Sequence, residues 1–295
     1  MFTSNTKRIF VHVSGLLLSA TLLAGCLASA PAAPVVVAPS VVEPVAAEPA
    51  VVEIIAKDHH FVAPASIEGG WVTIRFKNEG QEPHHVQLLR LNDGISMEDF
   101  SAALQQGPLA ALQVVTVEGG AAPVDPAGEQ SVTMELKPGL YVLICFVPGA
   151  DGVPHLAKGM IAPLEVVAGA SNSAQAPAAD HEVKLVNFSF VLPQAIKSGA
   201  QTWKITNEGT QPHEFNVIKL AEGVAMTDVM HWMHEPSGPP PFSNAGGLQG
   251  INPSASGYLH LNLTPGAYVA ICHIPDADSG QEHAALGMIM PFTVK

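Results

Sequence analysis

The sequence predicts an all-β protein built from two tandem Greek-key β-sandwich domains with short helical insertions. The first observation is an internal repeat, in which four blocks of residues recur at an offset of 127 to 129 positions. The second is a turn-rich composition, with 26 Gly and 25 Pro in 295 residues and only 13% charged residues. The third is length, because each repeat of roughly 115 residues suits a sandwich of seven or eight strands.

The chain begins with the pattern of a secretory signal over residues 1–25. A short basic region precedes an apolar run that ends in Leu-Ala-Gly-Cys at 23–26, which indicates a signal peptide rather than a membrane span. This ending resembles the lipobox of bacterial lipoproteins, which implies cleavage before Cys26 and a lipid on that cysteine. We therefore expect an extracytoplasmic protein that is lipid-anchored to a bacterial membrane. The alternative is an ordinary secretory cut near Ala28 or Ala30, which gives a soluble protein.

Two linkers divide the rest of the chain. Residues 26–51 are mostly Pro, Ala and Val, and repeated Pro favours an extended tether over a packed helix. A second linker at 168–180 separates the repeats. The predicted domains are therefore 52–167 and 181–295.

The repeat is visible as aligned blocks, and chance does not hold one register over all of them. They are 78–91 with 207–220, 96–100 with 225–229, 137–146 with 264–273, and 155–166 with 283–294.

Each repeat is expected to consist of strands. The stretches "WVTIRFKN" and "TWKITN" alternate polar and apolar residues and stop at Asn-Glu-Gly turns. The runs "LYVLICF" and "AYVAIC" are continuously apolar, as expected for a central strand, and each follows a Pro-Gly turn. The stretches 96–115 and 225–235 are predicted to be helical.

Four residues with metal-binding side chains, two His, one Cys and one Met, recur in the same order in both repeats. Two imidazoles, a thiolate and a weak axial thioether are the ligands of a mononuclear blue-copper site. A lone Cys, His or Met usually packs in a core or caps a backbone group, but an ordered set that occurs twice favours metal binding. The candidate ligands are His84, Cys145, His155 and Met160 in the first repeat, and His213, Cys272, His283 and Met288 in the second.

This ligand order, with Pro before the first His and Gly before the Met, resembles the cupredoxin family of blue copper proteins. The resemblance covers nearly all of 52–167 and 181–295, and it implies one copper ion per domain and two per chain. The loops from Cys145 to His155 and from Cys272 to His283 depart from the family, because they are longer than in plastocyanin and differ from each other by one residue.

Two histidines compete for the role of first ligand in the first repeat. Neighbouring residues in a strand point to opposite faces, so His84 and His85 cannot both enter one site. The repeat partner of His84 is His213, whereas the partner of His85 is Glu214. We therefore choose His84. The adjacent pair His59-His60 is not expected to form a joint site, for the same geometric reason.

These observations predict an electron-transfer protein with one type 1-like copper site per domain, a membrane anchor and a protein redox partner. The net charge of −13 argues against nucleic-acid binding, since no basic stripe exists to neutralise phosphates. One alternative is copper capture or delivery without redox turnover. Another is a metal-free structural pair of sandwiches.

An enzymatic function is not expected. Copper nitrite reductases and multicopper oxidases place additional histidines around the cysteine, and here Ile144 and Ile271 stand before it. A catalytic copper centre would therefore need other histidines, such as His231, His234 or His260.

Overall fold

The structure is a computed structural model that describes residues 47–169 and 174–295. The expected signal peptide (1–25), the expected lipidation site Cys26 and most of the predicted tether lie outside the described residues. Within the described part of the chain, no helix is both long and apolar enough to cross a membrane.

The fold is mostly β, with three short α-helices and one 3-10 turn in the described residues. The first repeat contains β1 (Ala50–Lys57), β2 (His60–Val62), β3 (Ser66–Glu68), β4 (Gly70–Asn78), β5 (His84–Leu91), α1 (Met97–Gln106), α2 (Pro108–Leu112), β6 (Val115–Val124), β7 (Glu129–Leu136), β8 (Gly139–Ile144), η1 (His155–Lys158) and β9 (Ile161–Val167). The second contains β10 (His181–Val186), β11 (Ser189–Val191), β12 (Gly199–Asn207), β13 (His213–Leu220), α3 (Met226–His234), β14 (Phe242–Ile251), β15 (Ser256–Leu263), β16 (Gly266–Ile271) and β17 (Ile289–Val294). Since β1 begins at Ala50, the last two residues of the predicted tether belong to a strand.

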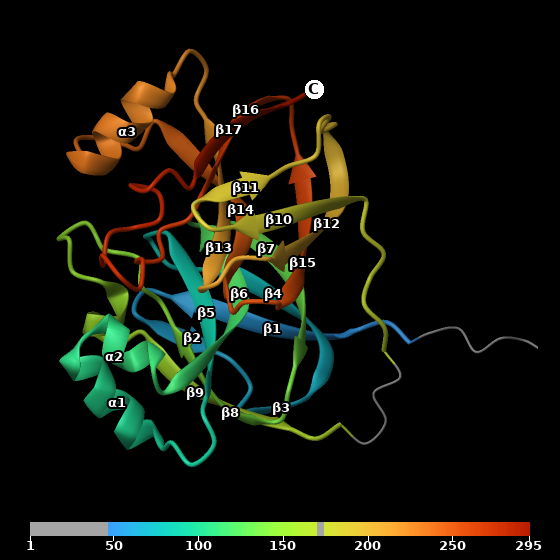
Figure 1. Ribbon diagram of the computed structural model, residues 1–295, viewed down its shortest axis with the longest axis vertical. Helices are drawn as coiled ribbons and strands as arrows, with labels where there is room; N and C mark the ends of the chain where they lie inside the picture. Colours follow the sequence, from blue (N-terminus) through green and yellow to red (C-terminus); the bar gives the residue numbers. More distant parts are fainter. Residues whose placement is uncertain (1–46, 170–173) are drawn as a thin grey trace, which may run out of the picture. The chain divides into compact units, whose positions relative to one another are not determined.

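The strands form two mixed sheets. One has the order β11-β10-β12-β15-β7-β4-β1-β2, and the other has the order β17-β16-β13-β14-β6-β5-β8-β9-β3. Each repeat therefore contributes one half of each sheet, as Figure 1 shows by the separation of blue-green from yellow-red strands. Apart from β3, each strand of one repeat has its counterpart from the other repeat at the same distance from the opposite end of the sheet. The two β-sandwiches predicted from the sequence are confirmed in this arrangement.

The two sandwiches share their sheets across the boundary between the repeats. Strand β6 pairs antiparallel with β14, and β7 pairs antiparallel with β15. Side chains reinforce this boundary: Gln87 Nε2 donates to Gly250 O at 3.1 Å, and Gln130 Nε2 donates to Gly247 O at 3.0 Å. The sequence did not predict this continuity.

Hydrophobic periodicity explains how the first sandwich closes. In β4, the alternate residues Val72, Ile74 and Phe76 are buried, and they pack in one core with the alternate residues Tyr141 and Leu143 of β8. The two sheets are therefore joined by the inward faces of amphipathic strands.

The helical insertions explain why β8 and β16 are apolar on both faces. Val142 and Ile144 point away from the main core and pack with Phe100 of α1. In the second repeat, Val269 and Ile271 pack in the same way with Val229 of α3. A strand that is covered on both sides reads as a continuous apolar run, and with the helices in place the last four residues of each strand, 141–144 and 268–271, are buried.

Glycine pairs in β6 and β14 permit a close approach to β5 and β13, the strands that begin at His84 and His213. Gly120 has a φ of +135°, and a Cβ built on it would lie 2.0 Å from the backbone oxygen of Val86. In the second repeat, a Cβ on Gly247 would lie 2.3 Å from the oxygen of Phe215. Only glycine fits there without moving the backbone.

We expect Gly120→Ala to lower the free energy of unfolding by on the order of 2–3 kcal/mol, because it adds a backbone clash to a strained φ. The matched control is Gly94→Ala, where φ is +84° but nothing lies within 4 Å, and about 1 kcal/mol should be lost. Urea denaturation measures both. Equal losses of unfolding free energy in the two variants would show that the backbone clash at position 120 is relieved without cost.

Candidate metal centres

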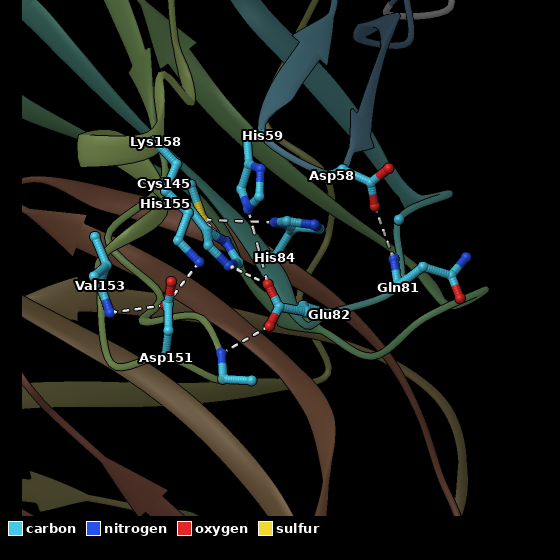
Figure 2. Close-up of polar contacts among 12 residues, drawn as sticks. Asp58, His59, Gln81, Glu82, His84, Cys145, Asp151, Val153, His155 and Lys158 are labelled. Carbon is cyan, nitrogen blue, oxygen red and sulfur yellow. Dashed lines mark hydrogen bonds and ion pairs between the residues drawn. The ribbon is translucent and has the colours of Figure 1, made fainter.

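The first ligand group converges at one end of the first sandwich. His84 is the first residue of β5, Cys145 directly follows β8, and His155 begins η1. The Cys145 Sγ atom lies 4.0 Å from His84 Nδ1 and 3.6 Å from His155 Nδ1. Figure 2 shows both imidazole rings beside the sulfur. These three residues and Met160 each have 0% exposure.

The second group repeats this arrangement. His213 begins β13, and Cys272 directly follows β16. The Cys272 Sγ atom lies 3.3 Å from His283 Nδ1, which lies 3.0 Å from His213 Nδ1. These residues and Met288 are also 0% exposed. Both cysteines are free thiols, so neither is withdrawn into a disulfide.

Backbone hydrogen bonds fix the loop that carries the last three residues of each set. Met160 N donates to His155 O at 2.9 Å, and Cys145 N donates to Met160 O at 3.2 Å. The chain can return in this way because Gly159 adopts a left-handed φ of +102°. The second repeat has the same bonds among Cys272, His283 and Met288, with Gly287 at +111°. This geometry explains the Gly-Met pair in both loops.

The Asn-Glu-Gly turns make room for the first histidine. A Cβ built on Gly80 would lie 2.7 Å from His84 Nε2, and one on Gly209 would lie 2.5 Å from His213 Nε2. Asn78 holds the first turn in place, because its Oδ1 accepts from Gly80 N and its Nδ2 donates to Glu82 O, both at 2.8 Å. The turn motif therefore positions the imidazole.

Burial controls the protonation of both groups. It raises the pKa of the Cys145 thiol to about 11 and also raises the pKa of Cys272. Burial lowers the pKa of His84 and of His213 to about 4. Without a metal, each site at neutral pH therefore contains a protonated thiol and neutral imidazoles. A bound cation would replace the thiol proton.

Each of the two groups fits one copper ion. Metal–nitrogen and metal–sulfur bonds of roughly 2.0–2.3 Å allow two ligand atoms of one ion to lie about 4 Å apart or less. The distances of 3.0 to 4.0 Å given above meet this limit. Two imidazoles and a thiolate are the strong donors of a type 1 copper site, and a fully buried methionine accepts the backbone N–H of each cysteine through its carbonyl oxygen.

The residue after the first histidine is outside the ligand group and has the same structural role in both repeats. His85 does not join the ligand group, and its Nε2 accepts the backbone N–H of Phe146 at 2.6 Å. In the second repeat, Glu214 Oε1 accepts the N–H of His273 at 2.6 Å. Each side chain therefore holds the residue that follows the cysteine.

A buried chain of hydrogen bonds connects Glu214 in β13 to Gln249 in β14. Glu214 Oε1 accepts from Asn216 Nδ2 at 2.8 Å, and Asn216 Oδ1 accepts from Gln249 Nε2 at 2.9 Å. Buried amides thus fix the Glu214 carboxylate beside the second candidate site.

Sequence reasoning missed two residues at the first site. Glu82 Oε2 lies 3.0 Å from His155 Nε2, and the ring of His59 lies edge-on to that of His155 at 5.2 Å. Strand alternation predicts no joint site at His59-His60, but His59 lies in a turn and its ring faces His155. The repeat alignment offered one indication, because the second repeat has Phe188 in place of His59 and Gln211 in place of Glu82.

The other histidines considered in the sequence lie elsewhere. His231 and His234 are exposed on α3, and His260 is hydrogen-bonded to Thr133 and Thr202. Among residues 47–169 and 174–295, none of these three belongs to a cluster of potential metal ligands.

Comparisons with known proteins give the following similarities. No family model matches the chain, and no curated protein matches it. Among solved structures, reduced auracyanin from Roseiflexus castenholzii is 20% identical, with a TM-score of 0.28 over 41% of this chain and 99% of its own. Auracyanin A, a "blue" copper protein from Chloroflexus aurantiacus, is 25% identical, with a TM-score of 0.28 over 40% and 99%. A blue copper oxidase from Nitrosomonas europaea is 15% identical, with a TM-score of 0.25 over 84% and 86%.

The strand order and the ligand groups of this chain define its fold class. Each repeat forms a β-sandwich that buries one set of His, Cys, His and Met at the ends of its strands. The chain therefore has a cupredoxin-like fold with two His-Cys-His-Met sites.

Proposed function

We propose that this protein carries electrons outside the cytoplasm, with one type 1-like copper ion in each repeat. The observation that supports this most directly is the duplicated, fully buried group of two imidazoles and one thiol. A bound copper ion would supply the one-electron couple. The fixed turns and loops keep the ligands in place in both oxidation states, which limits rearrangement during electron transfer.

The burial of the ligands favours electron transfer over copper delivery. Handing copper to an acceptor requires the acceptor's ligands to reach the ion, and all eight candidate residues have 0% exposure. Electrons, in contrast, can leave through a buried ligand without its displacement. We therefore rank copper capture or delivery second and a metal-free structural function third.

The setting of the protein is part of the proposal. The lipobox-like sequence supports attachment through Cys26 to a bacterial membrane, and a second redox protein is the expected partner. We propose a carrier rather than an enzyme, because each copper-ligand group contains the side chains for one ion.

Loading the purified protein with Cu(II) tests the proposal. We expect two copper ions per chain, an intense visible thiolate-to-copper band, and rapid bleaching of that band by a one-electron reductant. Metal analysis and stopped-flow spectroscopy measure these properties. Tight Cu(I) binding without fast electron exchange would support copper capture, and the absence of the band with copper present would refute electron transfer by this route.

A further inference from the structure

A second group of metal-binding side chains lies on the outer edge of the first site. His59, Glu82 and His155 each offer one ligand atom, and these atoms lie within 4.8 Å of one another. Glu82 Oε2 is 3.0 Å from His155 Nε2 and 3.9 Å from His59 Nε2. Figure 2 shows the two rings and the carboxylate converging from separate segments of the chain. The function proposed above uses only His155 of this group.

The His59 ring has a nitrogen in need of a partner. Its Nε2 atom is buried and has no hydrogen-bond partner, which is unfavourable for a polar atom removed from water. The neighbouring Glu82 carboxylate is too far for a hydrogen bond at 3.9 Å. This separation is compatible with two ligands of one ion, and such an ion would satisfy both groups.

The second repeat has neither a histidine matching His59 nor a glutamate matching Glu82. The ring of Phe188 lies edge-on to His283 at 5.3 Å, in the place that His59 takes beside His155. Gln211 Oε1 accepts from Ala277 N, as Glu82 Oε1 accepts from Ala150 N. The loop contact is therefore kept by glutamine, and the charged oxygen of Glu82 is not needed for it.

The charge and the access of this group suit a cation. Glu82 Oε1 is occupied by the Ala150 N–H at 2.7 Å, whereas Oε2 faces both His155 and His59 and is placed to bind a cation between them. The nearby Lys158 ammonium opposes a cation but is paired with Asp151 at 2.8 Å. The side chains of His59 and Glu82 are 38% and 31% exposed, so this group lies nearer the protein surface than the fully buried copper ligands.

We propose that His59 Nε2, Glu82 Oε2 and His155 Nε2 bind one divalent cation of the zinc class. Two imidazoles and one carboxylate are a known zinc set that leaves a position for water. His155 then faces the cation with Nε2 and Cys145 with Nδ1, and its Nε2 proton passes to solvent on binding. The first repeat thus has two adjacent metal sites, and the second has one. This site does not require copper at Cys145.

Zinc titration of the protein tests the proposal, with calorimetry and metal analysis as readouts. The copper-loaded protein should bind one further zinc ion per chain. His59→Phe and Glu82→Gln, which install the residues of the second repeat, should each lose that zinc ion and keep both copper ions. A variant with Cys145→Ser and Cys272→Ser should still differ from its His59→Phe derivative by one zinc ion.

The outcomes separate this proposal from the function proposed above. Zinc binding that is equal in the wild-type protein and in His59→Phe, or no additional zinc at all, overturns the zinc site and leaves Glu82 as a hydrogen-bond acceptor of His155. A missing visible copper band together with the extra zinc ion overturns only electron transfer.

Discussion

Cys145→Ser and Cys272→Ser should each remove about half of the visible thiolate-to-copper absorption, and the double variant should remove all of it. Within the described parts of the chain, each cysteine is the one thiol grouped with its histidine pair, with sulfur-to-nitrogen distances of 3.6 and 3.3 Å to the loop histidines. The intense band requires a copper–thiolate bond, so a serine hydroxyl cannot replace it. Visible spectra of copper-loaded variants at matched protein concentration measure the effect.

Two controls make this result specific. His85→Gln changes a buried neighbour that is outside the ligand group, so it should keep the band. Circular dichroism should show that the serine variants retain their strands, since serine is close to cysteine in size. If one single variant removes the whole band, only one of the two groups binds copper in this way.

The metal-free protein should lose stability steeply as the pH falls from about 6.5 towards 4. The pKa of His84 and of His213 is about 4, and that of His85 is about 3, each lowered mainly by burial. In the unfolded chain these imidazoles titrate near 6.5. Their contribution is therefore complete above pH 6.5, and it declines below it as the unfolded state binds protons that the native state cannot bind.

The expected size is on the order of several kcal/mol, because one pKa unit for one group corresponds to about 1.4 kcal/mol. Glu214 acts in the opposite direction, because burial raises its pKa and the native state takes up that proton more readily. Urea denaturation of the metal-free protein between pH 7.5 and 4.5 measures the balance. A free energy of unfolding that stays constant over this range would contradict the prediction.

The sequence predicted the two ligand groups because the repeat made them visible. His84 could be chosen over His85 only because the second repeat has Glu214 at the corresponding position. The pattern also predicted that β8 and β16 would be central strands. Both inferences depend on local periodicity and on comparison of one half with the other.

The remaining features depend on tertiary contacts that leave no local pattern. His59 approaches His155 because Asp58 adopts a left-handed φ of 46° in the turn after β1, which strand alternation does not anticipate. The pairing of β6 with β14 occurs in strands rich in glycine and alanine. Such strands give little indication of a partner in another repeat.

The shared sheets have a consequence for the distance between the two candidate copper sites. His84 and His213 begin strands β5 and β13, which the hydrogen-bonded strands β6 and β14 connect without a break. Their spacing is therefore set by the backbone hydrogen bonds between these paired strands. A hop of charge from one centre to the other would cover the same gap in every molecule, and its speed would respond to side chains along the way rather than to hinge motion.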